Sequence, residues 1–204
     1  MRLLTACIVT LLISFIACAN SGTSSNARSG GNQKAASEAA LLYFGKMRNG
    51  DVSYGVLHSI MHYKILEAQM ESLGSGDITG KAKQKKIEEL FRKYFENQIS
   101  PHMLWGDVHT YLDGAEFSVL ESTAMSSEKI EERGISSDAG TVYQVFVKFV
   151  ETKRASSMVM NGKLIRAFIL DVPVHYYDGQ YFINTFKWDL VLSGMEYWDE
   201  APSS

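Results

Sequence analysis

The spacing of apolar residues changes along the chain from a helical to an alternating pattern. In the first half, apolar positions recur every three or four residues. From Ala115 onward they alternate with polar positions and are rich in β-branched and aromatic side chains. A helical half followed by a strand half is typical of an α+β fold rather than of alternating βαβ units. We therefore expect one α+β domain over residues 36–200, with three N-terminal helices and an antiparallel sheet of four or more strands.

Three helices are predicted before the sheet. The first covers residues 37–48, with Ser37 as its N-cap. The second covers residues 52–73 and is capped by Asp51 or Ser53; its apolar residues spread around the helix, so neighbours should cover it. The third has the clearest apolar stripe, at positions i, i+3, i+4, i+7 and i+8: Ile87, Leu90, Phe91, Tyr94 and Phe95.

Four strands are predicted in the second half, over residues 116–125, 141–152, 163–177 and 180–188. The polar segment 126–140 is expected to be a hairpin loop. Asp178-Gly179 is a strong signal for a two-residue turn, because both central residues of a type I′ turn need positive φ. The last two strands should therefore form a tight hairpin.

The register of this hairpin sorts its side chains onto two faces. A two-residue turn places His175 opposite Phe182 and Asp171 opposite Phe186. One face then holds a polar trio among aromatic residues, and these are our candidate ligand-binding residues: Asp171, His175, Asn184, Phe182, Phe186 and Trp188. The other face is almost wholly apolar: Phe168, Leu170, Val172, Val174, Tyr176, Tyr181 and Ile183. Either helices and loops cover both faces or one face binds another molecule; through the family resemblance given below, these residues are our candidate dimer interface.

The polar trio has two readings. Asp171, His175 and Asn184 form the polar floor of an apolar pocket, where a few polar groups orient a ligand. Alternatively they are hydrogen-bonded to neighbours or solvated at the rim of the sheet. In the first reading an Asp beside a His also permits acid–base chemistry.

Metal, cofactor and nucleic-acid functions have little support in the sequence. His58 and His62 are four residues apart on a predicted helix and could share one metal ion, but the stretch HSIMH lacks the Glu of an HExxH motif and a third ligand. There is no Gly-rich phosphate loop and no nucleophile elbow, so we expect no cofactor and favour a non-enzymatic function, with an enzyme left open. The acidic charge balance gives no basic face for nucleic acid.

The N-terminus has the pattern of an export signal. One cation, Arg2, precedes an uncharged apolar run over residues 3–17, which is too short for a typical membrane-spanning helix. A segment rich in Ser, Gly and Asn follows, and it has nothing to bury against the cost of ordering it. We expect a signal peptide over residues 1–17 and a flexible linker over residues 18–35.

The end of the apolar run, Phe15-Ile16-Ala17-Cys18, resembles the lipobox of bacterial lipoproteins, although Phe15 stands where the usual motif has Leu. The resemblance implies cleavage before Cys18, lipidation of Cys18 and attachment to a membrane. With Ala19 in place of Asp, it also implies passage to an outer membrane, facing the periplasm. An ordinary signal peptidase site at Ala17 or Ala19 is the alternative.

The order of elements resembles the NTF2-like superfamily of cone-shaped (cystatin-like) α+β domains, in which a curved sheet folds over the helices. The late stretch HYYDGQYFINTF is similar to the closing hairpin of small NTF2-like lipoproteins. The resemblance implies a homodimer formed through the outer face of the sheet. We expect a membrane-tethered, non-enzymatic module that binds a protein partner in the envelope or a secretion complex; a small-molecule binder with an apolar pocket under the last hairpin is the alternative, and an NTF2-like enzyme is a third.

Overall fold

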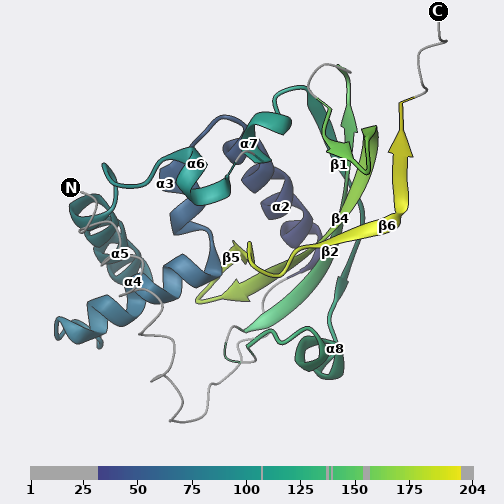
Figure 1. Cartoon of the computed structure of the whole chain (residues 1–204). Helices are drawn as coiled ribbons and strands as arrows, with labels where there is room; N and C mark the ends of the chain where they lie inside the picture. Colours follow the sequence, from purple (N-terminus) through teal and green to yellow (C-terminus); the bar gives the residue numbers. More distant parts are fainter. Residues whose placement is uncertain (1–31, 107, 137, 139, 154–156, 199–204) are drawn as a thin grey trace, which may run out of the picture.

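The computed structural model describes residues 32–106, 108–136, 138, 140–153 and 157–198, and these residues form an α+β arrangement (Figure 1). Six helices precede the first strand within this part of the chain: α2 (Gln33–Arg48), α3 (Val52–Leu57), α4 (Ile60–Ser72), α5 (Gly80–Tyr94), α6 (Pro101–Trp105) and α7 (Val108–Tyr111). The strands and one further helix follow: β1 (Ala115–Ala124), α8 (Ser127–Glu132), β2 (Thr141–Glu151), β3 (Val159–Met160), β4 (Lys163–Tyr177), β5 (Gln180–Ile183) and β6 (Asp189–Tyr197).

The long strand β4 is the centre of the antiparallel sheet. The strand order is β1-β2-β4-β3, and β5 and β6 also pair with β4. One edge of β4 is paired with β2 over ten residue pairs. Along the opposite edge, β5 pairs with residues 174–177 and β6 with residues 165–171. The sequence prediction of an antiparallel sheet with four or more strands is confirmed.

Helix α2 covers one face of the sheet (Figure 1). Its buried residues pack on the inward side chains of β2 and β4. Phe44 contacts Phe149 edge to face at 4.9 Å, and Phe149 stacks on Phe168 at 4.8 Å. Aromatic pairs in these geometries contribute about 0.5–1.5 kcal/mol each beyond the burial of their surface. This layer is the larger hydrophobic core.

The face that the sequence predicted as a dimer interface is the face under α2, and that prediction is wrong. Phe168, Val172, Val174 and Ile183 are at most 4% exposed within the single chain. The other three members pack against the same core: Leu170, Tyr176 and Tyr181. The apolar side chains on this face of the sheet are buried by helix α2 of the same chain.

A second, smaller core lies at the hairpin end of the sheet, between α4, α5 and the outer face of β5. The stripe of α5 is confirmed here: Ile87, Leu90 and Phe91 are buried, and Tyr94 and Phe95 pack beside them. Phe182 is fully buried against Tyr63, with ring centroids 4.5 Å apart. The helices therefore cover one face of the sheet with α2 and reach the other face at this end with α4.

Several boundaries differ from the sequence prediction. Helix α2 begins at Gln33 with Asn32 as N-cap, because the Asn32 side chain accepts a hydrogen bond from the Ala35 amide. The linker predicted to reach residue 35 therefore ends earlier, and Ser37 is inside the helix. The predicted loop 126–140 contains α8, so the helices are not all N-terminal.

The predicted second helix is two helices, separated at His58 and Ser59. Asp51 caps the first by accepting a hydrogen bond from the Tyr54 amide. At the break, the His58 carbonyl accepts a hydrogen bond of 2.8 Å from the Ile183 amide, and Ser59 forms a parallel bridge with Ile183. The edge of β5 thus competes with the helix for this backbone, and the helix is interrupted.

The predicted strand 180–188 ends at Ile183, and a second strand begins at Asp189. The predicted pairs Tyr177–Gln180 and His175–Phe182 are confirmed. The pair Asp171–Phe186 is wrong, because Asp171 lies opposite Asp189. No helix among the described residues is long and apolar enough to cross a membrane.

Candidate functional site

A pocket of about 510 Å³ opens between α4 and the connection from β5 to β6. This volume is within the range of about 300–1,000 Å³ that is usual for small-molecule sites. The wall is built from α3 and α4, the segment after α5, the segment after α8, and residues 184–187. Its apolar lining residues are Val56, Ile60, Met61, Ile65, Leu66, Phe95, Ile99, Ile135 and Phe186.

The polar groups of the lining are few. Asn184 and His175 lie on the sheet side, and His62 lies on α4. Two lysines, Lys64 and Lys187, also line the pocket. No Asp or Glu is among the described residues that line it. The pocket is therefore mostly apolar, with a few hydrogen-bonding side chains and two lysines in its wall.

His175 and Asn184 form a buried polar pair at the pocket wall. Their exposed fractions are 1% and 6%, and Asn184 Nδ2 lies 3.2 Å from His175 Nε2. The Asn184 amide donates a backbone hydrogen bond of 2.9 Å to the Pro173 carbonyl, which continues the hairpin one residue beyond β5. Asn184 Oδ1 is buried without a hydrogen-bond partner among the described residues, which is a cost of about 1–3 kcal/mol.

Asp171 is not part of the pocket. Its carboxylate lies 2.8 Å from the Arg133 guanidinium as an ion pair without an aligned hydrogen bond, and it accepts a short hydrogen bond from Gln144. Asp171 and His175 are four residues apart on one strand, a separation of about 13 Å. The acid–base pair considered from the sequence is therefore not formed, and Asp171 instead holds α8 against the sheet.

The three aromatic candidates lie in three different places. Phe186 lines the pocket at its rim and is 65% exposed. Phe182 is fully buried in the smaller core. Trp188 is on the α2 side of the sheet, with its ring 5.3 Å from that of Phe44. Alternation fails beyond Ile183 because the chain leaves the ladder between β5 and β6.

The two histidines considered for metal binding belong to different helices. His58 is the C-cap of α3 and stacks on Tyr54 at 3.7 Å. His62 is in the first turn of α4, and its Nδ1 lies 2.9 Å from Ser59 Oγ. Burial lowers the pKa of both imidazoles and favours the neutral form. No group of three potential ligands that could hold a metal ion occurs among the described residues.

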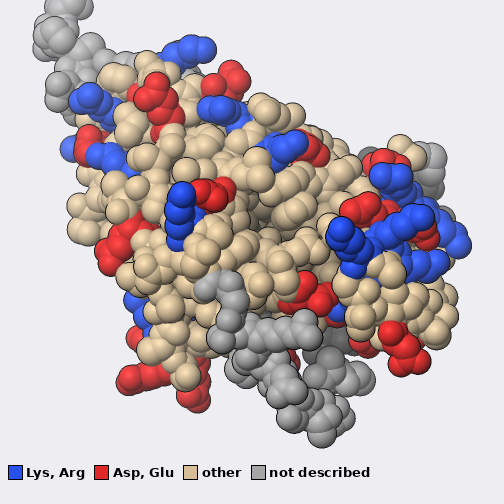
Figure 2. All heavy atoms as spheres, turned by 180° about the vertical axis from the view of Figure 1, so that it is seen from behind, with Lys and Arg blue, Asp and Glu red and all other residues tan. Residues whose placement is uncertain are grey.

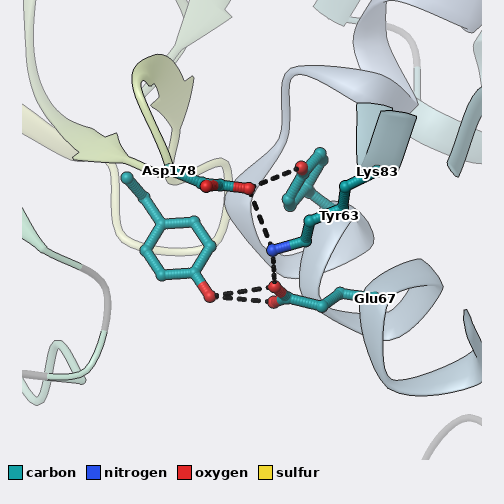
Figure 3. Close-up of polar contacts among 5 residues, drawn as sticks. Tyr63, Glu67, Lys83 and Asp178 are labelled. Atoms are coloured by element: carbon teal, nitrogen blue, oxygen red, sulfur yellow. Dashed lines mark hydrogen bonds and ion pairs between the residues drawn. The ribbon is translucent and has the colours of Figure 1, made fainter. Parts of the chain in front are cut away.

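A polar cluster beside the pocket joins the β4–β5 turn to helices α4 and α5 (Figure 3). The Lys83 side chain reaches between the carboxylates of Glu67 and Asp178; its Nζ is 2.9 Å from Asp178, and its contact with Glu67 is also an ion pair. Tyr177 donates to both oxygens of Glu67, at 3.1 and 2.9 Å. Tyr63 donates to Asp178 at 3.4 Å. One cation thus bridges two acids from different parts of the chain.

Burial and the contacts within this cluster shift the pKa values of its lysine and its two tyrosines. Burial opposes the charge on Lys83, but the hydrogen bonds that Lys83 donates to Glu67 and Asp178 outweigh it and raise the Lys83 pKa above 10.5. Burial raises the pKa of Tyr63 to about 12, and burial together with the Glu67 charge raises that of Tyr177. A lysine held this firmly in its charged form is a structural anchor rather than a nucleophile or a base.

The charge of the surface is unevenly distributed. Figure 2 shows basic side chains gathered at one end of the molecule, over α5, and a middle region that carries few charges. Helix α5 contributes six basic residues: Lys81, Lys83, Lys85, Lys86, Arg92 and Lys93. Lys86 faces Glu89 at 3.5 Å, so part of this charge is paired along the helix surface.

The sequence missed most of the pocket wall. Three of its candidates, His175, Asn184 and Phe186, do line the pocket, but Ile65, Ile99 and both lysines come from segments that no motif marks. One signal pointed toward the α4 wall, namely the apolar residues spread around the predicted second helix.

In comparisons with known proteins, no family model matches the chain, and neither the curated proteins nor the solved structures contain a significant match.

Proposed function

We propose that this domain binds a small, mostly apolar molecule in the pocket between α4 and the β5–β6 connection. The observation that carries the proposal is the lining of the pocket. Its wall is largely aliphatic and aromatic, and the buried pair His175–Asn184 adds a small number of fixed polar groups. An apolar cavity with a few polar groups that orient the ligand is the usual form of a small-molecule site.

This choice differs from the protein-interaction module that the sequence favoured. That module required an exposed apolar sheet face, and the face in question lies under α2. The enzyme reading also loses its basis, because Asp171 is engaged by Arg133 and is distant from His175. Binding without chemistry is therefore the function that the geometry supports best.

We also propose that the chain is exported and lipid-anchored through Cys18. Residues 1–31 lie outside the described residues, so this part of the proposal rests on the sequence alone. The linker expected from the sequence, about 14 residues from Cys18 to the start of α2, would have a root-mean-square span of roughly 20 Å. The pocket would then operate close to a membrane surface, with the outer membrane, facing the periplasm, as the expected location.

The finer fold assignment is likewise a proposal. An NTF2-like domain has a curved sheet folded over helices, with a pocket between the layers. Helix α2 against the inner face of β2 and β4 supports this assignment. The position of the pocket, beside α4 at the hairpin end, and the presence of α8 between β1 and β2 are features that such an assignment has to accommodate.

The binding proposal is tested with N-phenyl-1-naphthylamine, an apolar dye that becomes fluorescent when it leaves water. The purified protein should bind the dye at one site. Ile65→Trp, at a partly exposed position of the pocket wall, should block that site. Leu42→Trp, at a 50% exposed position on α2, adds the same side chain elsewhere and is the matched control. Equal dye binding by both variants would overturn the proposal.

The anchoring proposal is tested separately. The unaltered chain and a Cys18→Ala variant should differ in membrane fractionation and in labelling with radioactive palmitate. We expect the unaltered chain in the membrane fraction and the variant in the soluble fraction. Soluble behaviour of both would exclude the anchor and would leave the binding proposal unaffected.

A further inference from the structure

Among the described residues that line the pocket, Asp and Glu are absent and two lysines are present. Lys64 lines the pocket from α4, and Lys187 lines it from the β5–β6 connection. The remaining polar lining residues are His62, Ser136, His175 and Asn184. The described lining therefore includes two lysines and no carboxylate, which suits an anionic group better than a cationic one.

Lys64 is held in place by an aromatic ring rather than by an acid. Its ammonium lies 5.0 Å from the centre of the Tyr177 ring, a cation–π contact, and it forms no ion pair with a described residue. The nearby acids Glu67 and Asp178 are already bridged by Lys83. In the cluster of Figure 3, both carboxylates are in direct contact with Lys83 rather than with Lys64.

Lys187 is positioned by the backbone around it. Its carbonyl accepts a hydrogen bond from Arg133, and its amide donates to the Asn184 carbonyl at 3.3 Å. A methyl group on Gly134 would lie 3.3 Å from Lys187 Nζ, so the ammonium lies against the Gly134 backbone. Arg133 itself is engaged by Asp171 and Asp189. The acids at this side of the pocket are thus also paired with another cation.

From this arrangement we propose that the ligand is an amphipathic carboxylate, with an acyl chain in the apolar cavity and its acid group at the mouth between Lys64 and Lys187. The inference rests on the proposed function and adds the chemical class of the ligand. An acid group at the mouth keeps its contact with water and gains two cations, while the chain replaces water against Ile60, Ile65 and Ile99. A cationic or zwitterionic head would place a positive charge beside two lysines.

The two parts of such a ligand have separate energetic signatures. Each buried methylene contributes about 0.8 kcal/mol, so affinity should fall about fourfold for each methylene removed from the chain. Partly exposed ion pairs are modest, so the two lysines together should favour the carboxylate over a neutral head about tenfold. This preference should shrink with added salt, because the Debye length falls as ionic strength rises.

The experiment measures displacement of N-phenyl-1-naphthylamine by three twelve-carbon probes: dodecanoate and dodecyltrimethylammonium below their critical micelle concentrations, and dodecanol below its solubility limit. We expect dodecanoate to bind about tenfold more tightly than dodecanol, and the ammonium probe to bind most weakly. Lys64→Gln and Lys187→Gln should each weaken dodecanoate about threefold and leave dodecanol unchanged. Lys85→Gln, on exposed α5 away from the pocket, removes the same charge and should change neither.

A second pair of variants keeps the test independent of lysine packing. Phe186 is exposed at the rim, so Phe186→Glu and Phe186→Gln should both fold. They differ in one negative charge, and only the Glu variant should lose the preference for dodecanoate. Equal affinity for dodecanoate and dodecanol in the unaltered protein, or an unchanged preference in both the lysine variants and Phe186→Glu, would overturn the inference.

The outcomes separate the two proposals. If dodecanol displaces the dye and Ile65→Trp prevents this, but dodecanoate has no advantage, the pocket binds apolar molecules and the carboxylate inference fails alone. If none of the three probes displaces the dye, or if Ile65→Trp leaves their binding unchanged, both proposals fail. A preference for dodecanoate that is lost in the lysine variants supports both.

Discussion

Lys83 Nζ lies 2.9 Å from the Asp178 carboxylate, and this contact joins α5 to the turn between β4 and β5. The same ammonium pairs with Glu67 on α4, so one side chain connects three elements. We predict that Lys83→Gln lowers the free energy of unfolding by about 2–3 kcal/mol, because it leaves two partly buried carboxylates facing each other. Urea denaturation followed by circular dichroism measures this. Lys85→Gln, on the exposed side of α5, should change stability by no more than about 0.5 kcal/mol; similar losses in both variants would contradict the prediction.

Asp171 is predicted to matter for stability and not for ligand binding. Asp171→Asn removes the charge that faces Arg133, whose side chain is 10% exposed, and should cost about 2–4 kcal/mol. Because Asp171 is outside the pocket, the affinity for N-phenyl-1-naphthylamine should be unchanged at a temperature where the variant is folded. Denaturation and dye titration on the same sample check both parts. A loss of dye affinity without a loss of stability would place Asp171 at the site after all.

Gly55 is predicted to tolerate no side chain. A Cβ at this position would lie 2.1 Å from Trp105 Cζ2 and 2.7 Å from Leu104 Cδ2, so α3 would be pushed away from α6. Gly55→Ala should therefore cost about 1–3 kcal/mol by overpacking, although alanine favours helices. Gly76→Ala is the control, since its Cβ would meet Glu71 Cγ at 3.6 Å, an ordinary contact. Thermal melting of the two variants should separate them clearly.

We predict that the folded protein loses stability in mild acid because of His62. Burial lowers its pKa below the ordinary value of 6.5, and its neighbours are Ser59 Oγ at 2.9 Å and the Phe186 ring at 6.2 Å. The unfolded chain therefore takes up a proton at a higher pH than the folded chain does. The free energy of unfolding should fall as the pH drops through the ordinary value and should level off below the lowered pKa.

His58 adds to this effect because its pKa is lowered by the same cause. The double variant His58→Gln, His62→Gln should show a flatter dependence of unfolding free energy on pH between about pH 7.5 and 5.5 than the unaltered protein. Urea denaturation at four pH values measures the two slopes. Parallel curves for the two proteins would show that neither imidazole is responsible.

The elements whose signals are local were predictable from the sequence. The stripe Ile87, Leu90, Phe91 is set by helical periodicity, and the turn at Asp178-Gly179 by the need for positive φ, which the structure has at 49° and 81°. Register close to that turn followed from its length. These features depend on neighbours within a few residues, so the chain itself contains enough information to place them.

The features that the sequence predicted wrongly depend on contacts between residues that are distant in the chain. The interruption at His58 and Ser59 arises from pairing with Ile183, 124 residues beyond Ser59, and no local signal marks it. Tertiary packing also decides which face of the sheet α2 covers, since both faces of β4 are apolar enough to be buried. The candidate site was therefore predicted in part: His175, Asn184 and Phe186 line the pocket, while its α4 wall and its two lysines became visible only in three dimensions.

The backbone bond between the Ile183 amide and the His58 carbonyl also affects how the molecule meets other molecules. A bare sheet edge can add a strand from another chain and start aggregation. Here the chain's own interrupted helix occupies the outer edge of β5, so a second copy cannot pair there. Strand addition by another molecule is therefore blocked at this edge of β5 by the chain itself.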